Sequence, residues 1–197
     1  MTEVLAHPAT AKTTNLAPFE GPPIQGAGKP MISARTIARR VRQLGQDISA
    51  RYAGLDQPLV LVVILKGATV FAADLLRSLS IPAELEFVRA SSYGSGTSSS
   101  GKVRFAHMVD GPLTGRHLLL VEDIVDSGRT INVIVRKLKS HRPASVKLAA
   151  LLDRPARREE PVDISFTGFV IPDRFVIGYG LDYAGLYREL PAIYSLG

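Results

Sequence analysis

Hydrophobic positions along the chain repeat with two different periods, which predicts helices that alternate with strands. After Ser33, which can cap a helix, apolar residues recur at helical spacing as far as Ile48. Seven unbroken apolar residues then occupy positions 59–65. An apolar run without polar alternation is typical of a parallel strand that is buried on both faces.

The same periodicity over the rest of the chain predicts an α/β fold. Helices are expected from residue 33 and over residues 70–79 and 130–139, and strands over residues 59–65, 85–88, 117–121, 146–152, 164–170 and 175–179. Strands that alternate with helices favour a mainly parallel, twisted sheet flanked by helices. No internal repeat is evident.

Two segments break the pattern. Residues 1–30 are dominated by Thr, Ala, Pro and Gly, so we expect a flexible N-terminal extension and a single domain over residues 31–197. Residues 91–101 are almost all small and polar. A loop of that length inside a compact domain is usually a lid, a binding loop or a disordered segment, and the alternative is a plain flexible connector.

Composition narrows the classes of function. The chain has 24 Lys and Arg against 18 Asp and Glu, and its net charge of +6 favours anionic ligands such as phosphates, nucleotides, nucleic acid or acidic lipid. The absence of Cys excludes a disulfide framework, a zinc–thiolate site and a cysteine nucleophile. No apolar run is long enough to span a membrane and the first thirty residues lack a secretory signal, so we expect a cytoplasmic protein.

Candidate chemistry concentrates between Leu118 and Thr130. An apolar strand runs into Glu122 and Asp123, and the carboxyl end of such a strand is where ligands bind in open α/β sheets. The hydroxyl-rich loop 126–130 then opens a helix, whose first amides suit a phosphate group. The two carboxylates can accept hydrogen bonds from vicinal hydroxyls or help to hold a divalent cation. Neither a Rossmann fingerprint nor a Walker loop is present.

This thirteen-residue segment resembles the signature of the phosphoribosyltransferases. From about residue 30 to the C-terminus, the chain resembles the purine-salvage hypoxanthine (or hypoxanthine-guanine) phosphoribosyltransferases of bacterial type. The resemblance rests on residues 65–68, Ser92-Tyr93, 121–130, 151–158 and 171–183, in that order. It implies the type I phosphoribosyltransferase fold, with a small hood formed by terminal segments. It also implies a reaction in which 5-phosphoribosyl 1-pyrophosphate and a 6-oxopurine give IMP or GMP and pyrophosphate, with Mg²⁺ as cofactor.

The resemblance also implies a role for each matching residue. Asp126 is the expected catalytic residue, which accepts a proton at purine N7, and Glu122 and Asp123 are the expected ribose ligands. The expected phosphate ligands are Asp126, Ser127, Gly128, Arg129 and Thr130, and the expected pyrophosphate ligands are Lys66, Gly67 and Arg188, with a cis-capable bond between Leu65 and Lys66. The expected purine ligands are Arg154, Phe175 and Val176, the lid residues are Ser92 and Tyr93, and the metal ligand is Asp182, with Glu122 and Asp123 as further candidates.

One position departs from the family pattern. A lysine that donates to purine O6 usually follows Leu-Leu-Asp, but this chain has Arg154 there. Arginine keeps the charge and the donors, yet its planar fork is not interchangeable with an ammonium group, so the preference among hypoxanthine, guanine and xanthine stays open. Arg157 and Arg158 follow and are interpreted as surface charge or subunit contacts.

Partners are inferred from the same resemblance. We expect phosphoribosyl pyrophosphate and a 6-oxopurine as substrates and a homodimer or homotetramer, without a membrane or nucleic-acid partner. The alternative is a regulator that uses the phosphoribosyltransferase fold to sense nucleotides and bind RNA. The complete set of catalytic residues argues against that alternative, because a regulator does not need it.

Overall fold

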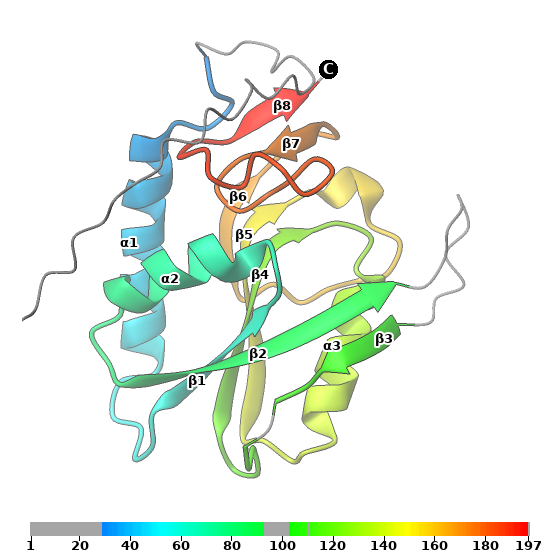
Figure 1. Ribbon diagram of the computed structural model, residues 1–197. Helices are drawn as coiled ribbons and strands as arrows, with labels where there is room; N and C mark the ends of the chain where they lie inside the picture. Colours follow the sequence, from blue (N-terminus) through cyan, green and yellow to red (C-terminus); the bar gives the residue numbers. More distant parts are fainter. Residues whose placement is uncertain (1–28, 93–102, 110, 197) are drawn as a thin grey trace, which may run out of the picture.

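A six-stranded, mainly parallel sheet forms the centre of the computed structural model, which describes residues 29–92, 103–109 and 111–196 (Figure 1). The strand order is β3-β2-β1-β4-β5-β6, and every pair is parallel except β2 with β3. The expected α/β class is confirmed. The sheet strands are β1 (Leu59–Ile64), β2 (Ala83–Ser92), β3 (Val103–His107), β4 (His117–Val125), β5 (Ser145–Asp153) and β6 (Phe166–Val170).

Helices cover both faces of this sheet. α1 (Ala34–Arg51) and α2 (Ala68–Ser78) lie on one side and α3 (Arg129–Lys139) on the other (Figure 1). Side chains of β1 alternate between the two sides, as the pleat of a strand requires. Val63 packs with the α1 and α2 side chains in what we call the α1/α2 core, and Val62 packs with those of α3 in the α3 core.

α1 forms where the periodicity predicts it. The Ser33 side chain accepts a hydrogen bond from the Thr36 amide at 3.2 Å, which satisfies one of the free amides of the first turn. Ile37 and Ile48, at the two ends of the apolar stripe, are both buried in the α1/α2 core. Arg40 bonds the Thr167 carbonyl at 2.7 Å, so part of the basic face of α1 attaches the helix to β6.

A second, two-stranded sheet forms a hood. β7 (Phe175–Ile177) pairs antiparallel with β8 (Tyr194–Leu196), and Ile32 bridges to Ile193. Both terminal segments of the described chain therefore contribute to the hood, as expected. Tyr179 connects the hood to the main body, because its hydroxyl donates to Asp74 of α2 at 2.6 Å. Burial and the Asp74 carboxylate raise the pKa of Tyr179, so this hydroxyl keeps its proton.

The structure differs from the sequence-based expectations at several boundaries. β2 continues to Ser92, so Ser91 and Ser92 belong to a strand and not to the predicted loop. β3, which was not predicted, pairs with this extension of β2 after a register shift at Arg89 and Ala90. β4 does not stop at Val121 but continues to Val125.

Some expectations concern residues that the structure does not describe. The N-terminal extension lies outside the described residues except for residues 29 and 30, as do Tyr93 and most of the expected lid. Among the described residues, no helix is long and apolar enough to cross a membrane.

Candidate active site

The carboxyl end of β4 and the loop that follows it open onto one cavity of about 270 Å³. Glu122 of β4 lines this cavity, together with Asp126, Ser127, Gly128 and Thr130. Leu65, at the end of the neighbouring strand β1, also contributes to the wall. The expected ribose ligand Glu122 and most of the expected phosphate loop are thus brought together.

Glu122 and Asp123 are neighbours on a strand, so their side chains lie on opposite sides of β4. Glu122 lines the cavity, whereas Asp123 lies against Gly67, where an added Cβ would come within 1.6 Å of Asp123 Oδ2. A side chain at position 67 would displace the Asp123 carboxylate, so glycine here lets the two segments approach this closely. The acidic pair thus connects the phosphate loop with the expected pyrophosphate loop.

Both carboxyl groups hold their protons more tightly than usual. Burial raises the pKa of Glu122 well above its ordinary value, and the neighbouring Asp123 charge raises it further. Burial also raises the pKa of Asp123 to about 6, against the lowering effects of the Ile124 amide and the Arg188 charge. Glu122 Oε2 is buried and has no hydrogen-bond partner among the described residues. A buried, unpaired polar atom of this kind is suited to a ligand hydroxyl.

The phosphate loop is shaped by Gly128. This residue adopts a φ of +88°, and an added Cβ would lie 2.5 Å from the Glu160 carbonyl oxygen. The Ser127 carbonyl accepts hydrogen bonds from the amides of Glu159 and Glu160, both at 3.0 Å. The segment that follows β5 therefore supports the loop. α3 starts immediately afterwards, and the amides of its first turn have no partners within the helix. This arrangement can bind an anion at the start of α3.

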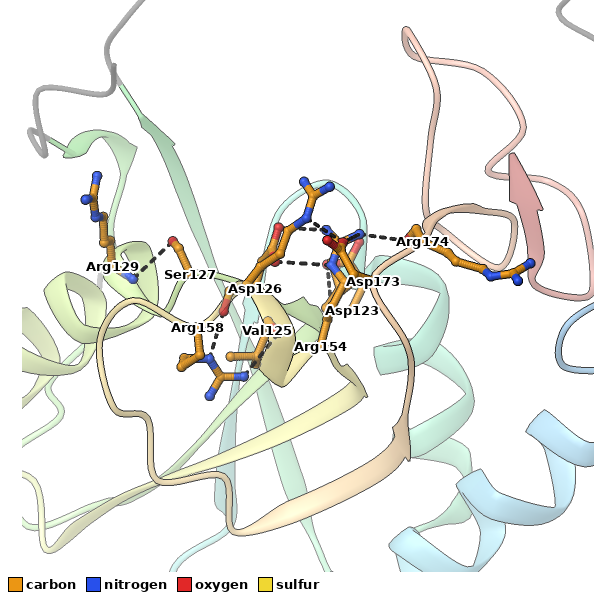
Figure 2. A network of polar contacts seen from close by, with 11 residues as sticks. Asp123, Val125, Asp126, Ser127, Arg129, Arg154, Arg158, Asp173 and Arg174 are labelled. Atoms are coloured by element: carbon orange, nitrogen blue, oxygen red, sulfur yellow. Dashed lines mark hydrogen bonds and ion pairs between the residues drawn. The ribbon is translucent and has the colours of Figure 1, made fainter. Parts of the chain in front are cut away.

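Asp126 is paired with Arg154. Arg154 Nε donates to Asp126 Oδ1 at 3.1 Å and Nη2 donates to Oδ2 at 2.6 Å, while Nη1 donates to the Arg174 carbonyl at 2.7 Å (Figure 2). The Arg154 side chain is only 8% exposed, and that of Asp126 is 38% exposed. The bidentate pair fixes the plane of the carboxylate beside the cavity.

The pyrophosphate loop lies under the hood. The predicted cis bond between Leu65 and Lys66 is confirmed. The Lys66 side chain is exposed. Gly180 of the hood packs so closely on this loop that an added Cβ would lie 2.2 Å from the Gly67 carbonyl oxygen. Arg188 is paired with Asp182 at 2.6 Å and donates to the Gly180 carbonyl at 2.5 Å, so both residues lie on the hood segment that meets the loop.

Phe175 is an aromatic surface on the hood. The residue is 46% exposed, although it belongs to a strand, and the Tyr183 ring meets its ring edge to face with the ring centres 5.9 Å apart. Val176, next to it, is buried. Phe175 and Arg154 are close in the fold, because the Arg174 carbonyl that Arg154 bonds immediately precedes Phe175. An exposed aromatic face beside a donor-bearing arginine suits a flat heterocycle.

Sequence reasoning missed part of this site. Arg158, which we interpreted as surface charge or a subunit contact, is mostly buried and bonds the main chain of Val125 and Asp126 (Figure 2). That surface interpretation is wrong for Arg158, whereas Arg157 is 52% exposed and pairs with Asp173. Arg158 reaches the loop because β5, which precedes it, pairs with β4. The local pattern of hydrophobic and polar residues does not indicate which strands pair.

Comparison with known proteins identifies the family. The family model described as "Phosphoribosyl transferase domain" matches residues 32–184. The chain is 44% identical over 163 residues to the hypoxanthine phosphoribosyltransferase of Salmonella typhimurium, an alignment that covers 83% of this chain and 92% of that protein. It belongs to the hypoxanthine phosphoribosyltransferase family.

Other members of the hypoxanthine phosphoribosyltransferase family agree with this assignment. The crystal structure of a hypoxanthine-guanine phosphoribosyltransferase from Bacillus anthracis superposes with a TM-score of 0.81 at 38% identity, over 86% of this chain and 98% of that one. The chain is also 46% identical over 165 residues to the bifunctional protein TilS/HprT of Listeria innocua. That alignment covers 84% of this chain, which spans about a quarter of the length of the bifunctional relative. The predicted type I phosphoribosyltransferase fold is confirmed.

Proposed function

We propose that this chain transfers the phosphoribosyl group of 5-phosphoribosyl 1-pyrophosphate to a 6-oxopurine, hypoxanthine or guanine, in purine salvage. The proposal is supported above all by the single cavity that joins Glu122, Asp126 and the anion-binding loop. Family membership over most of the chain supports it independently. The alternative of an RNA-binding regulator is not favoured, because the relatives that the chain covers almost completely are named as transferases.

In the proposed reaction, the bond between C1 of the ribose and pyrophosphate breaks and the bond to purine N9 forms. The proton that the purine loses passes from N7 to the Asp126 carboxylate, which lies at the cavity wall. The same negative charge stabilises the positive charge that develops on the sugar as pyrophosphate leaves. Arg154 keeps the carboxylate oriented for both tasks through its two hydrogen bonds.

The sugar phosphate is proposed to bind across the cavity. Its 5′-phosphate takes the amides and hydroxyls of Ser127, Gly128, Arg129 and Thr130 at the start of α3. The ribose hydroxyls meet Glu122, whose buried oxygen has no other partner among the described residues. Asp123, which lies against Gly67 on the other side of β4, is proposed to reach them from the side of the pyrophosphate loop. The pyrophosphate lies over Lys66 and Gly67, next to Arg188.

The purine is proposed to stack on the exposed ring of Phe175, with the Val176 backbone at its edge. Arginine has five N–H donors, and Asp126 and the Arg174 carbonyl take three of those of Arg154. One further N–H remains on Nη1, which also lies 4.0 Å from Asp173 Oδ1, and one on Nη2. In this proposal these donors serve O6, which would favour a 6-oxopurine over a 6-aminopurine. The expected closure of the Ser92-Tyr93 segment over the site stays a prediction, because Tyr93 lies outside the described residues.

Mg²⁺ is proposed as the cofactor. Within the residues that the structure describes, no group of three or more His, Cys, Asp or Glu side chains is arranged to hold a metal ion. Asp182 and the acidic pair can each supply only a few oxygens, which fits Mg²⁺, because this ion binds through one or two carboxylates together with substrate phosphates and water. When bound, the metal would neutralise charge on the leaving pyrophosphate.

Two further proposals concern the protein in the cell. We propose a homodimer or homotetramer, as predicted from the family resemblance, and a cytoplasmic location. Sedimentation would measure the first and cell fractionation the second.

A five-base assay tests the proposed function. Hypoxanthine, guanine, xanthine, adenine and uracil are each offered with phosphoribosyl pyrophosphate and Mg²⁺, and nucleotide formation is followed with and without EDTA. We expect IMP or GMP, and loss of turnover with EDTA. Turnover of uracil alone would reverse the base assignment, and no turnover combined with salt-sensitive RNA binding would favour the regulator.

A further inference from the structure

We propose that Arg158 is a positioning residue that sets the location of Asp126 through its main chain. The inference rests on the proposed function, since it concerns the group that accepts the purine proton. Arg158 itself does not line the cavity, so it is not a catalytic residue.

The contacts of Arg158 converge on the end of β4. Its Nε donates to the Asp126 carbonyl at 2.7 Å, and its Nη2 donates to the Val125 carbonyl at 3.3 Å. Nη2 also pairs with Asp153, the last residue of β5. Figure 2 shows the Arg158 guanidinium beside Val125 and Asp126. Through Asp153, it therefore connects the last residue of β4 and the first residue of the loop to β5.

These contacts are shielded from water. The Arg158 side chain is 17% exposed and that of Asp153 is 19% exposed, so their charge-assisted bonds are stronger than those of a surface pair. Arg157 is the adjacent contrast: it is 52% exposed and its partner is Asp173, not the loop. Of the two neighbouring arginines, only Arg158 therefore bonds the main chain of the loop, among the contacts of the described residues.

Asp126 is consequently held at two points. Arg154 bonds both oxygens of its side chain, and Arg158 bonds its carbonyl oxygen. With the carbonyl fixed, the swing of the carboxylate is limited to the side-chain torsions that Arg154 then restricts. A misplacement of about 1 Å can cost about a hundredfold in rate, so a loosened main chain should reduce turnover more than substrate binding.

Arg158→Gln and Arg158→Lys test this role, with Arg157→Gln as the matched control. For Arg158→Gln, we expect kcat to fall about tenfold to a hundredfold, while the KM for phosphoribosyl pyrophosphate changes by less than about threefold. Arg158→Lys keeps the charge beside Asp153 and should recover part of the loss. Arg157→Gln should stay within about twofold of the wild type. Equal kinetics for Arg158→Gln and Arg157→Gln would overturn the proposal.

A double-mutant cycle separates positioning from general destabilisation. If Arg158 acts through Asp126, its substitution has little left to disturb once Asp126 cannot take a proton. In the Asp126→Asn background, Arg158→Gln should therefore lower the residual kcat by less than about threefold. The same tenfold or larger loss in both backgrounds would indicate a merely structural role and refute the inference.

Hydrogen exchange distinguishes failure of this inference from failure of the proposed function. If the wild type forms no nucleotide from any base, the proposed function is wrong, but the exchange of the peptide over residues 124–130 still reports on Arg158. Faster exchange there in Arg158→Lys, but not in Arg157→Gln, supports the positioning role. Unchanged exchange in both variants rejects it.

Discussion

The Asp126 side chain has surroundings that are unusual for a proton acceptor. The buried guanidinium of Arg154 bonds both carboxylate oxygens of Asp126. The Asp126 side chain is nevertheless 38% exposed and lines the cavity. Each carboxylate oxygen has two lone-pair sites, so the pairing with Arg154 leaves one site on each oxygen for a substrate. Arg154 can therefore orient the Asp126 carboxylate without blocking the approach of a substrate to it.

Replacement of Asp126 should separate chemistry from binding. Asp126→Asn keeps the size of the side chain but cannot accept a proton, so we expect turnover to fall by at least about a hundredfold. The dissociation constant for IMP, measured by calorimetry, should change by less than about threefold. Asp163→Asn, at an acid that is 84% exposed, is the control and should match the wild type. Retention of full turnover by Asp126→Asn would remove Asp126 from the proposed chemistry.

The acidic pair predicts a pH dependence of stability. Burial raises the pKa of Asp123 to about 6, so between pH 4 and pH 6 the folded state binds more protons than the unfolded state. The contribution of Asp123 to the free energy of unfolding therefore decreases as the pH rises through this interval. It is lowest at pH values above the interval. The ligand-free protein accordingly carries a destabilising charge at neutral pH.

Asp123→Asn should relieve this destabilisation. We expect its melting temperature at pH 7.5, measured without substrate or metal, to exceed that of the wild type by about 3 °C or more. The difference should shrink towards pH 4, where the carboxyl group is protonated in the folded wild type and no longer carries a buried charge. Asp163→Asn should show no such trend. A pH-independent difference for Asp123→Asn would contradict the titration argument.

At the scale of elements, the short turn between β4 and α3 depends on a glycine. Gly128 has a φ of +88° and no room for a Cβ, whereas Gly115 has a φ of +73° with no heavy atom within 4 Å of the Cβ position. The two glycines share a left-handed backbone and differ in their surroundings. This pair therefore isolates steric contact from backbone preference.

Alanine at these two glycines should have different effects. Gly115→Ala should cost about 1 kcal/mol of unfolding free energy through backbone strain alone. Gly128→Ala should cost more, because the added methyl group meets the Glu160 carbonyl, and it should raise the KM for phosphoribosyl pyrophosphate by more than about tenfold. Urea unfolding and initial rates measure both effects. Similar losses in the two variants would argue against a built phosphate loop.

How well the elements could be predicted depended on where their partners lie. β1 and α1 are readable because their patterns are local: seven consecutive apolar residues, and an apolar stripe after a capping serine. β3 was missed because it forms only by pairing with β2 across an intervening segment, and β8 because its three residues depend on β7. Arg158 was misread for the same reason, since its partners are on β4.

At the scale of the whole molecule, the site lies between a rigid sheet and a small hood. Tyr179 donates to Asp74 at 2.6 Å, and Gly180 packs on the pyrophosphate loop. The hood carries Phe175, Asp182 and Arg188, so its attachment to α2 decides whether these residues face the loops of the sheet. The hydroxyl of Tyr179 is therefore a structural link between two halves of the site.

Removal of that hydroxyl should weaken the attachment of the hood. For Tyr179→Phe, we expect a loss of about 1 to 2 kcal/mol in unfolding free energy, because Asp74 loses a buried partner. The KM values for both substrates should rise, since their expected ligands are divided between hood and sheet. Tyr183→Phe is the matched control: Tyr183 is 43% exposed and its ring, which meets Phe175, is retained. Identical behaviour of the two variants would show that the Tyr179 hydroxyl is dispensable.

The alternation of β1 side chains also has a practical consequence for engineering. A single sheet separates the α1/α2 core from the α3 core. Side chains on its two faces, such as Val62 and Val63, therefore pack against different helices. Stabilising substitutions selected on one side should therefore combine nearly additively with those selected on the other. A thermostable variant can be assembled from two independent libraries, each screened without regard to its counterpart.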